Sequence, residues 1–141
     1  MKNDKILGVV YALPKSILER LFIIKNPIFV KYLAREITKK SKTKLTKLTD
    51  MYFYESDSNK KIIGSGKIIK IESLLISKIP KNYYPNIILD KKELLNYSKN
   101  RENKKLALIH LTNIRRFKKV KSLKKALTMA GLYLKPEHLK S

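Results

Sequence analysis

An almost unbroken apolar segment, residues 6–13 (ILGVVYAL), sets the strongest limit on what this part of the chain can form. It falls well short of the ~20 apolar residues that a membrane-spanning helix needs, and a strand buried on both faces accounts for such a run. Pro14 follows, at a place where the first turn of a helix tolerates proline. Apolar residues then recur at helical spacing from Ile17 to Phe22. The sequence therefore predicts a strand followed directly by a short amphipathic helix.

Further strand-like segments follow, separated by turn signals. Asn26-Pro27 ends the predicted helix, and residues 57–59 (DSN) separate an aromatic strand from a long strand, which predicts a hairpin. Asp90 and Glu93 have the spacing of a capping box and predict a second short helix that reaches Tyr97. The predicted strands after the first are residues 28–33, 51–56, 61–72 and 106–111.

Strands joined mostly by short turns, with few and short helices, are typical of the α+β class. We therefore expect a mixed sheet or a small barrel decorated by helices, and not a doubly wound parallel sheet. The 141 residues are enough for one domain with a substantial core. No internal repeat or long linker divides the sequence, so residues 1–141 are expected to form a single domain.

The charge balance is the main indication of function. Thirty-three Lys and Arg stand against eleven Asp and Glu, which gives a formal charge of +22. An A/T-rich genome would favour lysine over arginine, but it would not by itself make acids scarce. A small domain this basic most often binds nucleic acid and less often an anionic membrane surface. We therefore expect a nucleic-acid partner and no membrane partner.

Several classes of protein are excluded or disfavoured. The absence of cysteine excludes disulfides and cysteine-based zinc sites. Residues 6–13 faintly resemble the core of a signal peptide, but no small-residue cleavage site follows them. The sequence therefore predicts a cytoplasmic protein.

Two acid-poor clusters carry much of the positive charge. The first is a basic loop in residues 35–47, and the second follows the predicted strand 106–111 and includes Phe117. Such cations can hold phosphates, and Phe117 can stack on a base. The alternative is a solvated strand edge with Phe117 and Val120 turned inward, which for Phe117 is the interpretation we favour. The predicted nucleic-acid-binding residues are Arg35, Lys39, Lys40, Lys42, Lys44, Arg115, Arg116, Lys118, Lys119 and Lys121.

The order of these elements resembles that of a known family. The segments ILGVVYALPKSILERLF…KNPIFVKY, LTDMYFYESDSNKKIIGSGKIIKIES, LALIHLTNIRRFKKVKSLKK and TMAGLYL are similar to those of an archaeal family of unknown function in the PUA-like superfamily. That superfamily also contains the EVE, YTH and ASCH domains. The resemblance implies a small, partly open β-barrel with a few short flanking helices, and residues 115–141 packed on it as a basic segment. It also implies contact with RNA and a cleft for a base, in several relatives a modified one.

The resemblance also raises the question of catalysis, because some ASCH proteins hydrolyse modified nucleosides or cut RNA. Their recurrent pattern is Gly-x-Lys-x-x-Glu-x-Arg after the first helix. Lys25 fits this pattern, and Lys31 could replace its final basic group. The other three positions are occupied by Ile23, Ile28 and Val30, so the glutamate that such hydrolases need is missing. An enzyme with Lys25 or Lys31 as the catalytic base is therefore the second hypothesis.

A candidate base pocket lies at the end of the aromatic strand. Tyr54 and Ser56 occupy alternate positions and therefore share a face. An aromatic plane and a hydroxyl are the minimal chemistry for stacking on a base and bonding its edge. The alternative is that Tyr52 and Tyr54 cap a barrel face while Ser56 shapes the turn. The predicted base-pocket residues are Tyr11, Ser16, Lys25, Lys31, Tyr54, Ser56 and Ser65.

The remaining motifs are interpreted structurally. The glycines of residues 64–66 (GSG) indicate a bulge or a tight barrel bend and not a phosphate-binding loop. His110 lies inside an apolar strand, as a satisfied core histidine does, and His138 lies in a short terminal helix. Residues 123–134 loosely resemble a helix-turn-helix, but Pro136 would fall within the second helix, so a helical face with Leu123, Leu127 and Ala130 packed on the barrel is simpler.

Together these observations predict an RNA-binding module without a metal or other cofactor. Its basic surface would hold phosphates, and its cleft would receive a base. An ASCH-type enzyme acting on a modified nucleoside or on RNA is the alternative, and an architectural DNA-binding protein is a further one.

Overall fold

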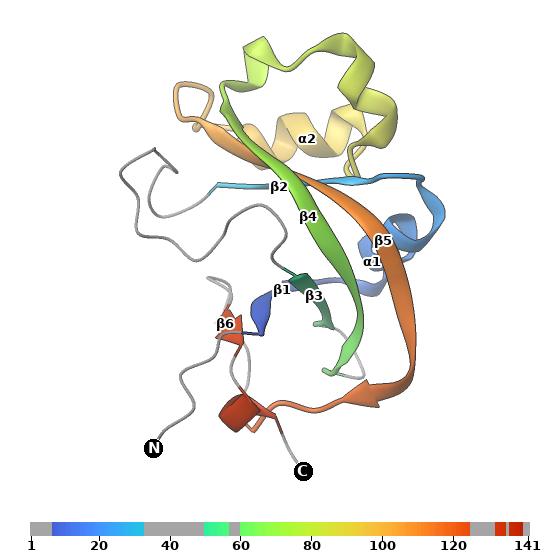
Figure 1. Ribbon diagram of the computed structural model, residues 1–141. Helices are drawn as coiled ribbons and strands as arrows, with labels where there is room; N and C mark the ends of the chain where they lie inside the picture. The colour runs from blue at the N-terminus through green and yellow to red at the C-terminus, as the bar shows by residue number, and fades with distance from the viewer. Residues whose placement is uncertain (1–6, 33–49, 57–59, 125–131, 135, 140–141) are drawn as a thin grey trace.

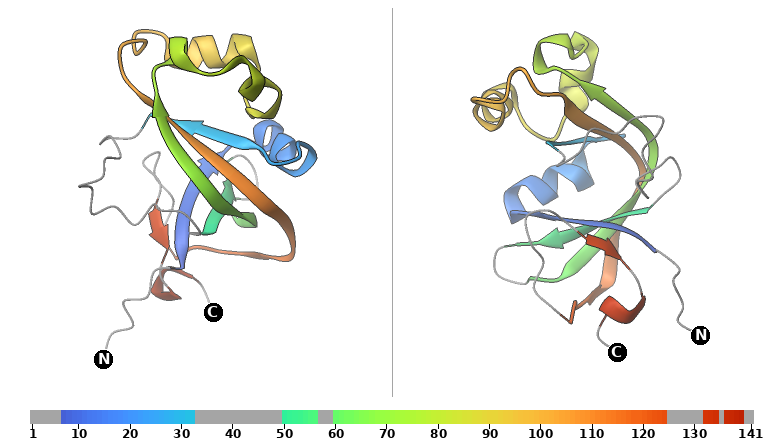
Figure 2. Two further views of the ribbon diagram at one scale, coloured as in Figure 1. Left: turned by 45° about the horizontal axis from the view of Figure 1, so that its top comes forward. Right: turned by 90° about the vertical axis from the view of Figure 1, so that its left-hand side faces the viewer.

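The computed structural model describes residues 7–32, 50–56, 60–124, 132–134 and 136–139. Its strands form one mixed sheet of six, in the order β2-β5-β4-β3-β1-β6, which curls on itself without closing (Figures 1 and 2). β1 and β3 are parallel, and the other neighbouring pairs are antiparallel. The strands are β1 (Gly8–Leu13), β2 (Ile28–Lys31), β3 (Asp50–Glu55), β4 (Ile62–Leu74), β5 (Leu106–Lys121) and β6 (Leu132–Leu134).

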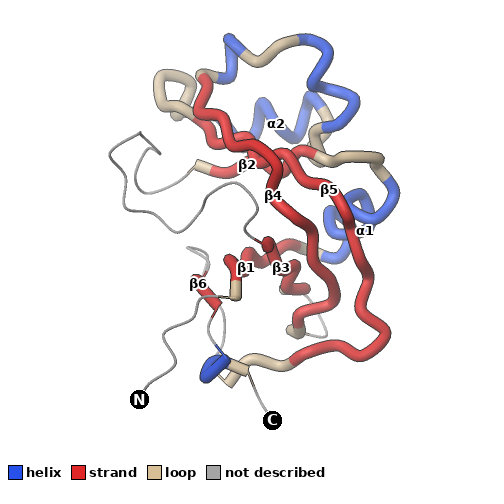
Figure 3. Tube along the Cα trace, viewed as in Figure 1, coloured by secondary structure: helices blue, strands red, loops and turns tan. Residues whose placement is uncertain are grey.

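Short helices decorate this sheet, as expected for the predicted α+β class. They are α1 (Lys15–Ile23), α2 (Lys91–Ser98) and the 3-10 helices η1 (Ile76–Lys78), η2 (Lys81–Asn86) and η3 (Pro136–His138). Figure 3 shows η1, η2 and α2 gathered at one end of the molecule. Within the part of the chain that the structure describes, no helix has the length and apolarity to span a membrane.

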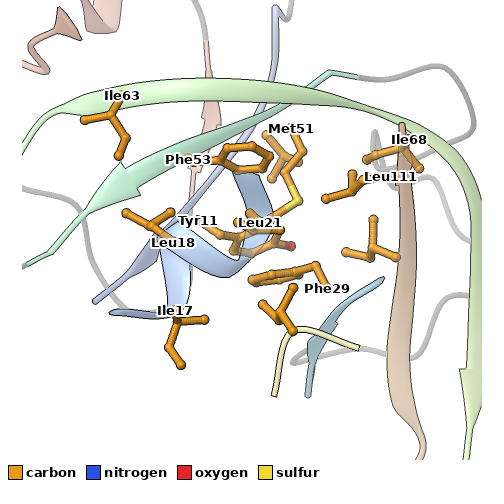
Figure 4. Close-up of a cluster of buried hydrophobic side chains, with 13 residues drawn as sticks. Tyr11, Ile17, Leu18, Leu21, Phe29, Met51, Phe53, Ile63, Ile68 and Leu111 are labelled. Carbon is orange, nitrogen blue, oxygen red and sulfur yellow. The ribbon is translucent and has the colours of Figure 1, made fainter. Parts of the chain in front are cut away.

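The main core lies between α1 and the concave side of the sheet. Leu18 and Leu21 of α1 are fully buried there, against Met51 and Phe53 of β3 (Figure 4). Pro14 caps the helix, and its carbonyl accepts a hydrogen bond from the Leu18 backbone N–H at 3.0 Å. The predicted strand–proline–helix unit is therefore confirmed, because its apolar spacing matches the face that is buried.

β4 and β5 form a long two-stranded ribbon with three register shifts, between Ile62 and Gly64, between Ser65 and Lys67, and between Ile68 and Lys70. The first two shifts surround the glycine pair, which confirms its interpretation as a bulged bend. β5 continues to Lys121, so the predicted strand, residues 106–111, was ten residues too short. The basic run therefore begins on a strand and not after one.

The predicted capping box of α2 is confirmed. The Asp90 carboxylate accepts from the Glu93 backbone N–H at 2.8 Å, and Glu93 Oε1 accepts from the Asp90 backbone N–H at 2.8 Å. Glu93 also pairs with Arg20 of α1, whose guanidinium donates to the Ile88 carbonyl at 2.9 Å. These contacts fasten the α2 end of the molecule to α1.

The C-terminal part lies against the opposite, outer side of β1 and β3. Leu123 is buried there with Val10, Tyr54 and Leu134, and it forms an isolated bridge with Leu139. The prediction that Leu123 lies on a helix is wrong, because Leu123 forms a β-bridge. The other two residues of the predicted helical face, Leu127 and Ala130, lie outside the described residues. Residues 132–134 form β6 beside β1, which agrees with rejecting the helix-turn-helix.

Candidate nucleic-acid interface

Three polar or aromatic residues form a row across the outer side of the sheet. Tyr52 of β3 is the register partner of Ser65 of β4, and Ser65 is the register partner of Arg115 of β5. Register partners on neighbouring strands project from the same face. The row therefore presents a phenol ring, a hydroxyl and a guanidinium side by side.

This row lies in a surface groove of about 690 Å³. We call it the β3–β5 groove. Its wall on the β3 side is formed by Asp50 and Tyr52, and its floor includes Ser65 and Gly66 of β4. The wall on the β5 side carries the cations and the second aromatic ring. Lys67 of β4 also lines the groove. The lining residues from β5 are Asn113, Ile114, Arg115, Phe117 and Lys121.

Two aromatic rings define the groove's shape. The centroids of Tyr52 and Phe117 lie 6.3 Å apart, with their planes tilted by 58°. The ammonium of Lys121 lies 5.4 Å from the Phe117 centroid. Gly8 leaves room for the tyrosine, since a Cβ there would be 2.9 Å from Tyr52 Cε2. Burial raises the pKa of the Tyr52 hydroxyl, and the charge of Asp50 raises it further, so this phenol stays a hydrogen-bond donor at neutral pH.

Cations outnumber acids in the groove. Lys67 Nζ lies 3.4 Å from Asp50 Oδ1, and both side chains are well exposed. Such an exposed ion pair contributes little to stability, so Lys67 can leave Asp50 and turn towards a phosphate with little loss of free energy. Arg115 is exposed, and among the described residues it has no side-chain hydrogen bond or ion pair. Its guanidinium is therefore ready to take a phosphate or the edge of a base.

Arg115 and Arg116 were both predicted to bind nucleic acid, but they lie on different sides of β5. Arg116 lies on the other side of β5, where its guanidinium donates to Glu19 Oε2 at 2.9 Å and lies 4.0 Å from the Phe22 centroid. It is thus bound to α1. Lys118 and Lys119 are exposed on β5 beyond the groove lining. The loop residues Arg35, Lys39, Lys40, Lys42 and Lys44 lie outside the described residues.

The proposed pairing of Tyr54 with Ser56 requires correction. Tyr54 is only 6% exposed and packs against Val10, Ile62 and Leu134. Its ring therefore has no open face for a base. β3 ends at Glu55, so exposed Ser56 belongs to the following turn, where its backbone N–H donates to the Leu13 carbonyl at 3.0 Å. This outcome agrees with the alternative that we gave for both residues.

Tyr52 lines the groove although it was not among the predicted base-pocket residues. It lies on the same strand face as Tyr54, but it pairs with Ser65 before the register shift between Phe53 and Tyr54. Leu123 and Leu134 of the C-terminal part bury Tyr54, whereas Tyr52 is only partly buried and lines the groove. Ser65, which was a minor candidate, lies on the groove floor.

The remaining pocket candidates lie elsewhere. Tyr11 is a core residue that stacks on Phe29, with ring centroids 5.2 Å apart, and Lys31 lies 5.2 Å from its centroid. Burial lowers the pKa of Lys31, and the positive charge of Arg101 lowers it further. Ser16 and Lys25 are exposed on α1 and just after it, respectively, and neither lines the groove.

A polar cluster on β4 and β5 was not foreseen from the sequence. Glu72 Oε1 accepts from the Tyr83 hydroxyl at 2.7 Å, lies 2.8 Å from His110 Nε2, and lies 3.4 Å from Lys70 Nζ. Burial by itself would raise the pKa of Glu72, but the hydrogen bonds from Tyr83 and His110 and the charge of Lys70 outweigh it and lower the pKa. The His110 ring therefore has a hydrogen-bond partner, as expected, and this partner is the Glu72 carboxylate. The described residues contain no group of acids and histidines that could hold a metal ion.

Comparison with known proteins supports the fold. A family model described as a domain of unknown function (DUF365) matches residues 6–136. This chain belongs to the DUF365 family. No curated protein matches the sequence significantly. The DUF365 chain is similar in structure to the ASCH protein from Zymomonas mobilis, with a TM-score of 0.74 at 13% identity, covering 94% of this chain and 90% of that one.

Two point variants of the same Zymomonas mobilis protein have similar scores. A serine-to-alanine variant gives a TM-score of 0.74 at 12% identity, covering 94% of this chain and 91% of that one. A tyrosine-to-phenylalanine variant gives 0.73 at 12% identity, with coverage of 94% and 93%. Identities this low establish the fold alone. The structural likeness confirms the expected α+β architecture of this DUF365 chain and shows that it has the fold of an ASCH protein.

Proposed function

We propose that this protein binds single-stranded RNA through the β3–β5 groove. The observation that carries the proposal is the row of Tyr52, Ser65 and Arg115 across three strands, on one face and in one groove. A sheet surface that offers aromatic rings beside cations is the arrangement that binds unpaired bases by stacking and the backbone by charge. The formal charge of +22 supports an anionic partner, and the resemblance to PUA-like proteins supports RNA.

A bound strand would use the groove as follows. One base stacks on the Tyr52 ring, whose hydroxyl and the neighbouring Ser65 hydroxyl can bond polar groups of the nucleotide. Lys67 and Lys121 provide cations for the flanking phosphates, and Arg115 can bond a phosphate or the edge of the base. Ser65 and Asn113 can bond a ribose 2′-hydroxyl, which is the group that distinguishes RNA from DNA. Lys118 and Lys119 extend the positive track beyond the groove.

The test is a fluorescence-anisotropy titration of labelled single-stranded RNA, duplex RNA and duplex DNA, with the wild type and the Tyr52→Leu variant. Leucine keeps the apolar bulk over Gly8 but removes the aromatic face. We expect single-stranded RNA to bind most tightly and the variant to bind it roughly tenfold more weakly, as for the loss of one stacked base. Tyr84→Leu, on η2 at the other end of the molecule, is the matched control and should leave binding unchanged.

Two results would contradict the proposal. Equal binding of all three nucleic acids, lost together as salt rises, would leave only non-specific attraction by the positive charge. Unchanged RNA affinity in Tyr52→Leu would remove the groove from the interface.

One observation favours the enzyme as a second candidate function. Burial and the positive charge of Arg101 lower the pKa of Lys31, and a lower pKa increases the fraction of the neutral amine that can act as a general base. The candidate reaction is hydrolysis of a modified nucleoside. A panel of modified nucleosides incubated with the wild type and with Lys31→Arg tests it by chromatography. Turnover by the wild type and its loss in the variant would establish this candidate, and no turnover of any nucleoside would reject it.

A further inference from the structure

The β3–β5 groove contains one feature that phosphate binding does not explain. Asp50, at the start of β3, is one of only eleven acids in a chain with thirty-three Lys and Arg, and it lines the groove. A carboxylate repels a phosphate, so a surface selected only for backbone charge would not contain one. A carboxylate accepts hydrogen bonds and cannot donate them when ionised. Asp50 is therefore suited to meet N–H groups on the edge of a base.

The opposite wall of the groove has the reverse chemistry. Arg115 only donates hydrogen bonds, and its fork matches two adjacent acceptors. Arg115 on β5 is level with Tyr52, and Asp50 lies two residues before Tyr52 on β3. The two walls are therefore separated by the width of β4 and by two residues along the strand, roughly 12 Å in all. That span leaves room for one base between a wall that accepts and a wall that donates.

Guanine is the base that fits both walls. It presents two neighbouring donors, N1–H and the N2 amino group, which a carboxylate can accept as a pair. It also presents the acceptors O6 and N7, which arginine recognises with two hydrogen bonds. Adenine and cytosine each offer Asp50 one amino group beside a ring-nitrogen lone pair, which the carboxylate repels. Uracil offers a single N–H between two carbonyl oxygens.

Two further observations support this orientation. Asn113 lines the groove with a backbone φ of 51°, in the left-handed region that asparagine tolerates better than most residues. Among the described residues its side-chain amide has no hydrogen-bond partner, so it can bond the base or ribose. The contact between Asp50 and Lys67, at 3.4 Å, is longer than the ~2.7–2.9 Å of a direct charge-assisted hydrogen bond. Asp50 can therefore exchange this partner for a base.

We propose that Asp50 and Arg115 make the groove a guanine-reading subsite of single-stranded RNA, with Asp50 as the residue that determines specificity. This inference rests on the proposed RNA-binding function and adds the base to it. The carboxylate accepts from N1–H and the N2 amino group, Arg115 donates to O6 and N7, and Tyr52 stacks on the ring. Lys67 and Lys121 then serve the flanking phosphates.

The experiment compares short oligouridine strands that carry one central guanine, inosine, adenine or uracil. Inosine keeps N1–H and O6 but lacks the N2 amino group. By anisotropy at fixed salt, the wild type should bind the guanine strand about tenfold more tightly than the uracil strand, with the inosine strand between them. Asp50→Asn should abolish this preference, because the amide puts a donor against a donor. The same variant should bind the uracil strand more tightly than the wild type does, since it removes a negative charge and releases Lys67.

Glu137→Gln, which removes the same charge at an exposed position on η3, is the matched control and should keep the guanine preference. Circular dichroism on each variant checks that it is folded. Equal binding of all four strands by the wild type would overturn the guanine assignment while leaving RNA binding intact. A preference that persists in Asp50→Asn would overturn the role of Asp50. Failure of every strand to bind would instead overturn the proposed function itself.

Discussion

Arg115 and Arg116 are neighbours in the sequence, but the alternation of β5 gives them different surroundings. Arg115 faces the groove, whereas Arg116 pairs with Glu19 and covers the ring of Phe22. We predict that Arg115→Ala weakens binding of single-stranded RNA about five- to tenfold, because one phosphate or base contact is lost. We predict that Arg116→Ala leaves this affinity nearly unchanged and lowers the free energy of unfolding by about 0.5–1 kcal/mol, as for an exposed ion pair with a cation–π contact.

Anisotropy titrations at several salt concentrations and denaturant unfolding of both variants measure these two effects. If Arg115 neutralises a phosphate, its removal should also reduce the slope of log K against log[salt] by about 0.7 for a single strand. Equal losses of affinity in the two variants would show that the groove face is not the interface.

Glu72 gives the fold a defined dependence on pH. Its pKa is lowered in the folded state, so its contribution to stability is present above the ordinary glutamate pKa of 4.5 and is lost as pH falls through the lower folded value. We predict that Glu72→Gln lowers the free energy of unfolding by about 1 kcal/mol near neutral pH, since hydrogen bonds from Tyr83 and His110 to a charged partner are weakened.

The difference between wild type and Glu72→Gln should shrink as the pH is lowered below 4.5, because the wild-type carboxylate then becomes neutral. Urea unfolding at a series of pH values measures this convergence. A difference that stays constant or grows towards acid pH would mean that the Glu72 carboxylate is not the group stabilised by these contacts.

At the level of elements, the β4–β5 ribbon depends on two glycines that face different neighbours. A Cβ on Gly64 would lie 2.5 Å from the Arg115 carbonyl oxygen and 2.8 Å from the Phe22 ring, so backbone and helix would both have to move. A Cβ on Gly66 would meet chiefly the terminal methyl of Ile114, at 2.6 Å, and that side chain can adjust. We predict a loss of about 2–3 kcal/mol for Gly64→Ala and a smaller loss for Gly66→Ala, measured by denaturant unfolding. Equal losses would contradict this account of the bulge.

The same ribbon shows where the sequence could and could not predict the structure. Apolar runs and capping signals located β1, α1, β2 and α2, because burial and backbone capping are local requirements. The pattern did not predict that β5 continues through residues 112–121, since polar residues on an exposed strand lack the alternation of a half-buried one. The choice between Tyr52 and Tyr54 was also beyond it. The two tyrosines share a strand face, and the choice depends on Leu123 and Leu134, which bury Tyr54 more fully than Tyr52. Packing of this kind is a tertiary property that the strand sequence does not contain.

The net positive charge of the whole molecule attracts nucleic acid in addition to the contacts that the groove makes. Its formal charge of +22 attracts any polyanion at low salt, but at about 0.15 M ionic strength exposed charges are screened beyond roughly 8 Å. Lys91 and Lys92 lie in the first turn of α2, at the end of the molecule away from β3 (Figure 1). Replacing both with Glu changes the charge by four, from +22 to +18. This change suits the N-terminus of a helix, so the fold should not suffer.

We predict that the Lys91→Glu, Lys92→Glu double variant binds single-stranded RNA several-fold more weakly than the wild type at low salt and equally well at about 0.15 M and above, because only the long-range attraction is reduced. Tyr52→Leu should show the opposite profile, a loss of affinity that persists at high salt, because stacking is not screened. Anisotropy titrations of both variants over one salt series measure the two profiles. If the double variant were as impaired as Tyr52→Leu at high salt, then binding would be distributed over the molecular surface, and the β3–β5 groove would not be its centre.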